Sequence, residues 1–185
     1  MMRHTIAVVL LLVTGACRTS HDPLAIPAID LLKEFDRADR RPHEAFSLVN
    51  RDRPAIAAPA PGRIVWTMTL PRHGELRTAV AIEGAAPVRF RIGVSDERIY
   101  EQLQSVIVAS PGTWTDVAVD LSAYAGWKWS LFYHPDFVAW HVALSTDAVQ
   151  GTPGRALWGT PEIVTDRRGA IEYEKRRRTT RNAAP

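Results

Sequence analysis

Two tryptophans, Trp114 and Trp127, are the side chains that the sequence places best for binding a ligand. Trp114 follows a Ser-Pro-Gly-Thr turn, and Trp127 comes directly after Gly126. An indole that stays exposed at the edge of a sheet can stack on the apolar face of a sugar while its N–H donates a hydrogen bond. We therefore name both tryptophans as candidate ligand-binding residues, with packing as the alternative role.

Two arginines, Arg89 and Arg91, alternate with apolar residues in the segment 88–94. In a strand of period two, both guanidinium groups point to the same outer face. Such a pair could bind an anionic sugar or a sulfate group through charge-assisted hydrogen bonds. The simpler interpretation, which we prefer, is a solvated strand face.

Two carboxylates, Asp116 and Asp120, also lie on one face of a predicted strand. They could be a catalytic pair or ligands of a structural calcium ion. We expect two solvent-facing aspartates, the second ending the strand, and keep the calcium site as the alternative. His134 and His141 are too few for a zinc site, which needs at least three protein ligands.

Signatures of catalysis are missing from the sequence. It contains no Gly-Xaa-Ser-Xaa-Gly elbow, phosphate loop or dinucleotide fingerprint. An active site would also need a nucleophile with its base, a carboxylate pair or a metal cluster in one cleft. We therefore expect no enzymatic activity and no cofactor beyond the calcium ion considered above.

The first sixteen residues have the pattern of a signal peptide, with a basic start and a short apolar run at 5–13. The segment 14–17, Thr-Gly-Ala-Cys, resembles the bacterial lipobox, although that pattern prefers leucine where Thr14 stands. Cys17 is the only cysteine, so a disulfide within the chain is excluded. The resemblance predicts a lipid anchor (palmitate among its acyl chains) on Cys17 and a place in the bacterial cell envelope; plain secretion is the alternative. Arg18 is not the aspartate that retains some lipoproteins at the inner membrane, which favours the outer membrane.

The positive charge is concentrated at the C-terminal end. The net charge is +3, and residues 166–185 hold seven basic and three acidic side chains, which leaves sixteen basic and seventeen acidic in the rest. A nearly neutral body gives no electrostatic case for nucleic acid. The tail has few apolar residues, so we predict that residues 166–185 are disordered. Contact with anionic lipid or polymer is the alternative.

From about Ala45 onward, apolar and polar residues alternate with a period of two in the segments that must position these side chains. Residues 17–27 are expected to form a tether, and residues 28–40 a short helix. Pro161 requires an edge strand or a bulge. The sequence therefore predicts one antiparallel β-sandwich over residues 28–165, with alternating strands at 64–70, 76–82, 88–94, 117–121, 127–133, 138–144 and 157–164.

Two phrases of the sequence resemble signatures of galactose-binding-like jelly rolls. They are Trp-Thr-Asp-Val-Ala-Val-Asp-Leu-Ser-Ala-Tyr-Ala-Gly at 114–126 and Ala-Leu-Trp-Gly-Thr-Pro-Glu-Ile at 156–163. Residues 46–163 also resemble the amino-terminal accessory domain of sulfatase-fused bacterial lipoproteins, in which Arg-Phe-Arg-Ile-Gly-Val-Ser-Asp, here at 89–96, recurs. The resemblance implies a jelly-roll fold and a link to a sulfatase-like enzyme.

The end of the chain departs from that family, because Asp166-Arg167-Arg168 leads into a basic tail and no sulfatase nucleophile motif is present. The resulting hypothesis is a non-catalytic, lipid-anchored module that binds carbohydrate or another envelope polymer, or that serves a sulfatase-like partner. The alternatives are a protein-docking or structural lipoprotein and a truncated remnant of a sulfatase fusion.

Overall fold

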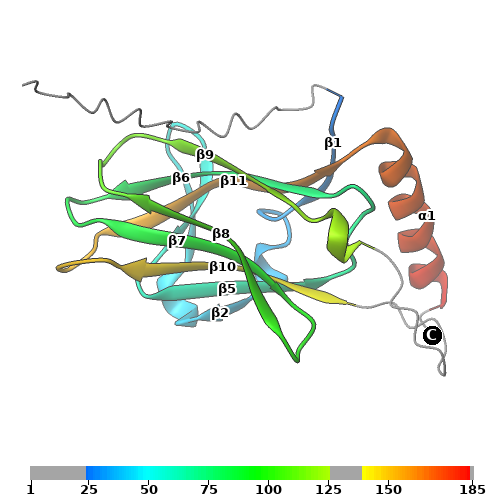
Figure 1. Cartoon of the computed structure of the whole chain (residues 1–185), viewed down its shortest axis with the longest axis horizontal. Coiled ribbons are helices and arrows are strands. Elements are labelled where there is room, and N and C mark those ends of the chain that lie inside the picture. The colour runs from blue at the N-terminus through cyan, green and yellow to red at the C-terminus, as the bar shows by residue number, and fades with distance from the viewer. Residues whose placement is uncertain (1–23, 126–138, 184–185) are drawn as a thin grey trace, which may run out of the picture.

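The computed structural model describes residues 24–125 and 139–183, with side chains up to residue 179. Two antiparallel sheets form a β-sandwich (Figure 1). The six-stranded sheet has the order β3 (Ser47–Asn50), β4 (Pro54–Ala58), β11 (Arg155–Thr165), β6 (Glu75–Glu83), β9 (Thr115–Asp120), and β1 (Ile26–Asp30) also pairs with β11. The five-stranded sheet has the order β2 (Asp39–Arg41), β5 (Gly62–Met68), β10 (Trp140–Ala148), β7 (Val88–Ser95), β8 (Tyr100–Val108). The predicted β-sandwich is therefore confirmed.

The core lies between the two sheets and is built by the period-two alternation of their strands. Its largest fully buried side chains include Trp66, Phe90 and Trp158. Phe90 and Trp158 meet edge to face across the sandwich, with ring centroids 5.0 Å apart. Trp140 is half-buried and packs against the same core, where Tyr124 meets it edge to face at 5.1 Å. Trp66 and Trp140 therefore both pack in or against the core.

The short helix expected over residues 28–40 is not formed. Residues 26–30 are strand β1, and only Phe35–Arg37 makes a 3₁₀ turn; two further 3₁₀ turns span His43–Ala45 and Ser122–Tyr124. The reason is pairing with β11, in which Ile29 stands opposite Ile163 and the Leu31 N–H donates to the Pro161 carbonyl at 3.0 Å. Hydrogen bonds to a distant strand outweigh a weak local helical spacing.

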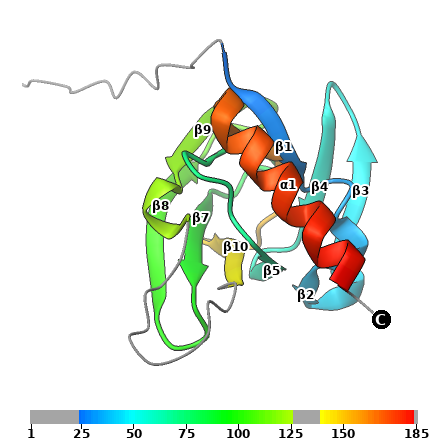
Figure 2. The same ribbon diagram turned by 90° about the vertical axis from the view of Figure 1, so that its right-hand side faces the viewer.

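The basic C-terminal segment forms helix α1 (Arg167–Ala183), which corrects the prediction of a disordered tail. Asp166 caps it, since its Oδ1 accepts the Gly169 N–H at 2.6 Å. Tyr173 packs against the core. Figure 2 shows α1 lying beside β1 at one end of the sandwich. Residues too polar to fold alone are ordered because the sandwich gives them a surface to bury against.

The predicted irregularity at Pro161 is a bulge in β11 between Gly159 and Glu162. Thr160, inside it, has a φ of 41°. β11 pairs on both sides with other strands, so the proline sits at a bulge in a central strand rather than at an edge.

Several predictions lie outside the described residues: the signal peptide, Cys17, Trp127, the strand at 127–133 and His134. So does most of the tether, although its last two residues, 26 and 27, belong to β1. Among the described residues, no helix combines the length and apolar character needed to cross a membrane.

Candidate functional site

Trp114 lies on the outer face of the six-stranded sheet, as the alternation predicts. The guanidinium carbon of Arg53 stands 4.8 Å from the centroid of the indole, and Arg53 also pairs with Asp116 at 3.7 Å. Trp114 packs beside a small apolar cluster of Ala57, Ala81 and Leu157. The indole is half-buried, with an arginine on its ring. It therefore covers the back of the sheet and offers little open ring surface.

The close approach of Trp114 to the sheet depends on Gly159. A β-carbon built on Gly159 would stand 2.7 Å from Cζ3 of Trp114 and 2.6 Å from Cδ of Arg53. Because Gly159 has no side chain, Trp114 and Arg53 can occupy the space that a β-carbon would take. Sequence reasoning named Trp114, but the arginine that stacks on it comes from a loop 61 positions earlier and carries no local signal.

The two aspartates of β9 share the outer face, as predicted, but have different partners. Asp116 faces Arg53. Asp120 ends the strand, because its Oδ1 accepts the Ser122 N–H at 2.8 Å. Hydrogen bonds from the Ser122 side chain and backbone lower the pKa of Asp120. Within the described residues, no group of three acidic, histidine or cysteine side chains could hold a metal ion.

The two arginines of β7 point outward from the five-stranded sheet. Arg91 forms an ion pair of 2.5 Å with Asp147 of β10, and both side chains are about one-third exposed (36% and 35%). Arg89 is exposed and stands opposite the same aspartate in the pairing register. His141, further along β10, lies 3.9 Å from Glu97. This face is therefore lined with charged groups that can donate and accept hydrogen bonds.

Tyr100 lies across the same face, and sequence reasoning missed it. A β-carbon on Gly93 would stand 2.4 Å from the Tyr100 hydroxyl oxygen and 2.5 Å from Cζ, so the phenol rests on the bare backbone of β7. Gly93 stands opposite Ala143 of β10, and both residues are buried. A glycine inside an alternating strand was the only sequence signal of this close approach.

Arg63 of β5 reaches the Tyr100 ring from the same outer face of the sheet. Its guanidinium carbon is 5.4 Å from the Tyr100 ring centroid, although β7 and β10 separate the two strands. Tyr100 remains 42% exposed, and Arg63 is also exposed. We call Tyr100, Arg63, Arg91 and Asp147 the tyrosine platform. It combines a partly exposed tyrosine, which packs against Gly93 and has the Arg63 guanidinium over its ring, with a second cationic donor and one carboxylate acceptor.

The similarities of this chain to known proteins are structural and distant. No family model and no curated protein matches it. Among solved structures, it is similar to the CBM22-1–GH10 modules of xylanase 10B from Clostridium thermocellum, determined with xylohexaose (13% identity, TM-score 0.46). That match covers 77% of this chain and 28% of the xylanase chain.

Two shorter proteins are similar over most of their length. The CBM22-1 xylan-binding domain of Xyn10C from Paenibacillus barcinonensis is 10% identical, with 65% of this chain and 81% of that domain covered (TM-score 0.43). A family 35 carbohydrate-binding module from Clostridium thermocellum is 16% identical, with 77% and 96% covered (TM-score 0.43).

Proposed function

We propose that this chain is a non-catalytic carbohydrate-binding domain whose ligand lies on the tyrosine platform. The observation that carries the proposal is the position of Tyr100, which packs against Gly93, has the Arg63 guanidinium 5.4 Å from its ring centroid and remains 42% exposed. A sugar ring can pack its apolar C–H groups against the exposed part of such an aromatic side chain while its hydroxyl groups reach polar partners around it. Arg63, Arg91 and Asp147 stand where hydroxyl groups would need partners.

The charge of the face that holds the platform favours a sugar that bears negative groups. Arg63, Arg89 and Arg91 supply three guanidinium groups against the carboxylates of Asp147 and Glu97, and Asp147 pairs with Arg91, so Arg63 and Arg89 are the cations placed to bind an anion. Guanidinium groups bind carboxylate or sulfate through two parallel hydrogen bonds. We therefore propose uronic or sulfated glycans as ligands, ahead of neutral ones.

The location that goes with this function is the cell envelope. A lipid on Cys17, proposed from the lipobox resemblance, would display the sandwich on the bacterial membrane, with the outer membrane favoured. The resemblance of residues 46–163 to accessory domains of sulfatase-fused lipoproteins supports a role beside a sulfatase-like enzyme. Glycan binding by the sandwich requires neither the lipid anchor nor the enzyme partner.

The test is a binding screen followed by titration calorimetry. We would use a chain that begins at Arg18, because both sheets and α1 lie within residues 24–183. Saturable binding to an acidic polysaccharide is expected, with a loss of at least tenfold in Tyr100→Ala and in Arg63→Ala. Ile107→Ala is the matched control, since it removes another exposed side chain from the strand that carries Tyr100.

Two outcomes would contradict the proposal. Absence of binding to every neutral, uronic and sulfated glycan would remove the function. Binding that is lost in Trp114→Ala and kept in Tyr100→Ala would move the site to the six-stranded sheet.

Docking of a protein partner is the second candidate function, and the edge of the five-stranded sheet favours it. β8 is an outer strand, and Ile99 and Ile107 are 71% and 52% exposed on or beside it. An edge strand with apolar side chains can pair with a strand of another chain. Loss of partner capture in Ile107→Lys, with glycan binding absent, would support this alternative.

A further inference from the structure

The start of helix α1 lies at the corner where the N-terminal segment enters the sandwich. Ile26, the first residue of β1, stands opposite Thr165 of β11, and α1 begins two residues later at Arg167. Figure 2 shows the beginnings of β1 and α1 at the same end of the molecule. Eight residues lie between Cys17 and Ile26, so the chain from Cys17 to Ile26 reaches at most about 30 Å. Under the lipid anchor proposed above, on which this inference rests, α1 would start within about 40 Å of the bilayer, since Arg167 is two residues beyond the partner of Ile26.

α1 is strongly basic, and its acidic residues are already engaged. The helix contains seven basic and two acidic side chains, a net charge of +5. Glu172 pairs with Arg72, Arg168 and Arg176 at 3.4 to 3.8 Å, and Glu174 pairs with Arg177 at 3.6 Å. Within the described residues, three cations of the helix form no ion pair: Arg167, Lys175 and Arg178.

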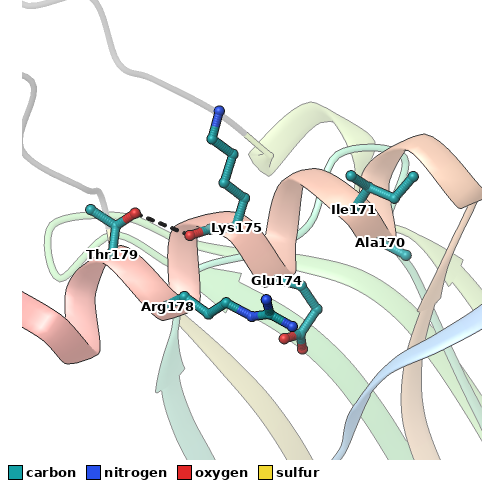
Figure 3. Close-up of a pocket in the computed structure, with 6 residues that line it drawn as sticks. All are labelled: Ala170, Ile171, Glu174, Lys175, Arg178 and Thr179. Carbon is teal, nitrogen blue, oxygen red and sulfur yellow. Dashed lines mark hydrogen bonds between the residues drawn. The ribbon is translucent and has the colours of Figure 1, made fainter.

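Two of these cations line a shallow hollow along the helix together with apolar side chains. The residues that line it are Ala170, Ile171, Glu174, Lys175, Arg178 and Thr179 (Figure 3). Ile171 is 63% exposed, and Figure 3 shows it on the same side of the helix as Lys175, one turn away. Lysine and arginine on this face can meet anionic headgroups, and the exposed aliphatic side chain of Ile171 lies beside them.

We propose that this face of α1 contacts anionic phospholipid and forms a second membrane attachment of the domain. The cations would lie at the headgroup phosphates, and Ile171 would touch the boundary of the acyl region. The high polarity of the helix limits the contact to the surface, with no deep insertion. Together, the lipid anchor and the helix would hold the sandwich in one orientation on the membrane.

Vesicle co-sedimentation tests the proposal without the acyl chains. The chain from Arg18 is mixed, at roughly physiological salt, with vesicles of phosphatidylcholine alone or of phosphatidylcholine with about 40% phosphatidylglycerol. The phosphatidylglycerol gives the second kind of vesicle a negative surface. We expect binding only to the anionic vesicles and its loss at high salt, because exposed charges are screened. The double variant Lys175→Glu with Arg178→Glu should bind at least tenfold more weakly. Arg51→Glu with Arg98→Glu makes the same charge change at exposed sites outside α1 and should bind nearly as well as the unaltered chain.

Three outcomes would overturn the proposal: equal binding to neutral vesicles, binding that the α1 double variant retains, or binding to dextran sulfate with none to anionic vesicles. If circular dichroism shows that the double variant does not fold, Lys175→Gln with Arg178→Gln removes the two positive charges without adding negative ones. This second variant then tests whether the two cations are needed for vesicle binding. Failure here is distinguishable from failure of glycan binding, because the glycan titration uses variants of a different face.

Discussion

The phenol ring of Tyr100 rests on Gly93 of the neighbouring strand, at a point where a β-carbon would stand 2.4 Å from the phenol oxygen and 2.6 Å from the Glu101 carbonyl oxygen. The pairing of β7 with β8 shifts register between Ile92 and Gly93. The glycine and the register shift together let the Tyr100 side chain pack against the backbone on the outer face of the sheet. The tyrosine platform depends on this contact.

Gly93→Ala is therefore expected to disturb both stability and binding. The new methyl group collides with Tyr100 and with the backbone of β8, and overpacking of this kind costs about 1–3 kcal/mol of unfolding free energy. Urea denaturation and glycan titration measure the two effects. The double variant with Tyr100→Ala should recover only part of the stability, since the backbone clash remains. If the losses of unfolding free energy in Gly93→Ala and Tyr100→Ala simply added up in the double variant, the contact between the two residues would be contradicted.

The junction of the two sheets gives a second expectation. Trp158 is fully buried and meets Phe90 edge to face, so Trp158→Ala leaves a large cavity and should cost about 3–5 kcal/mol. Trp114→Ala, which removes a half-buried indole outside the main core, should cost clearly less. Similar losses in the two variants, measured by chemical denaturation, would mean that Trp114 has a larger share in the packing than its position indicates.

The cap of α1 gives a third expectation. Asp166→Ala removes the acceptor of the Gly169 N–H and should weaken the helix by about 0.5–2 kcal/mol. Hydrogen exchange of the amides in α1 should accelerate while that of β6 and β11 stays unchanged. Asp166→Asn keeps an oxygen acceptor and is the matched control. Unchanged exchange in the alanine variant would show that packing of Tyr173 alone holds the helix.

The pH dependence of stability should carry a contribution from Glu162. Burial raises the pKa of Glu162, while Arg77 lowers it and Asp30 raises it further. The folded carboxyl therefore holds its proton more tightly than the unfolded one, so its contribution is fully present below the ordinary value of 4.5 and is lost as pH rises through the raised pKa. Glu162→Gln should remove this decline. In thermal unfolding, the decrease in stability between pH 4 and pH 7 should be smaller in Glu162→Gln than in the unaltered chain, with Glu44→Gln as the surface control. An identical decrease in Glu162→Gln would contradict the role assigned to Glu162.

Alternation in the sequence was sufficient to predict the sandwich and several of its strands. The segments around Trp66, Phe90 and Trp158 alternate strongly, and a strand with one buried face must do so. β8 was missed because Tyr100–Val108 is an edge strand with mostly exposed side chains, so its two faces differ little in polarity. The proline bulge in β11 was predicted because proline lacks the N–H that a regular ladder requires.

The sequence by itself determined the β class, the outward direction of Arg89, Arg91, Trp114, Asp116 and Asp120, and the concentration of positive charge at the C-terminal end. Each of these follows from local periodicity or composition. Only the tertiary structure decided that Arg53 occupies the ring of Trp114, that Tyr100 meets Arg63 across two intervening strands, and that the basic tail is a docked helix. These features depend on contacts between residues far apart in the chain, and the order in which strands pair leaves no trace in local periodicity.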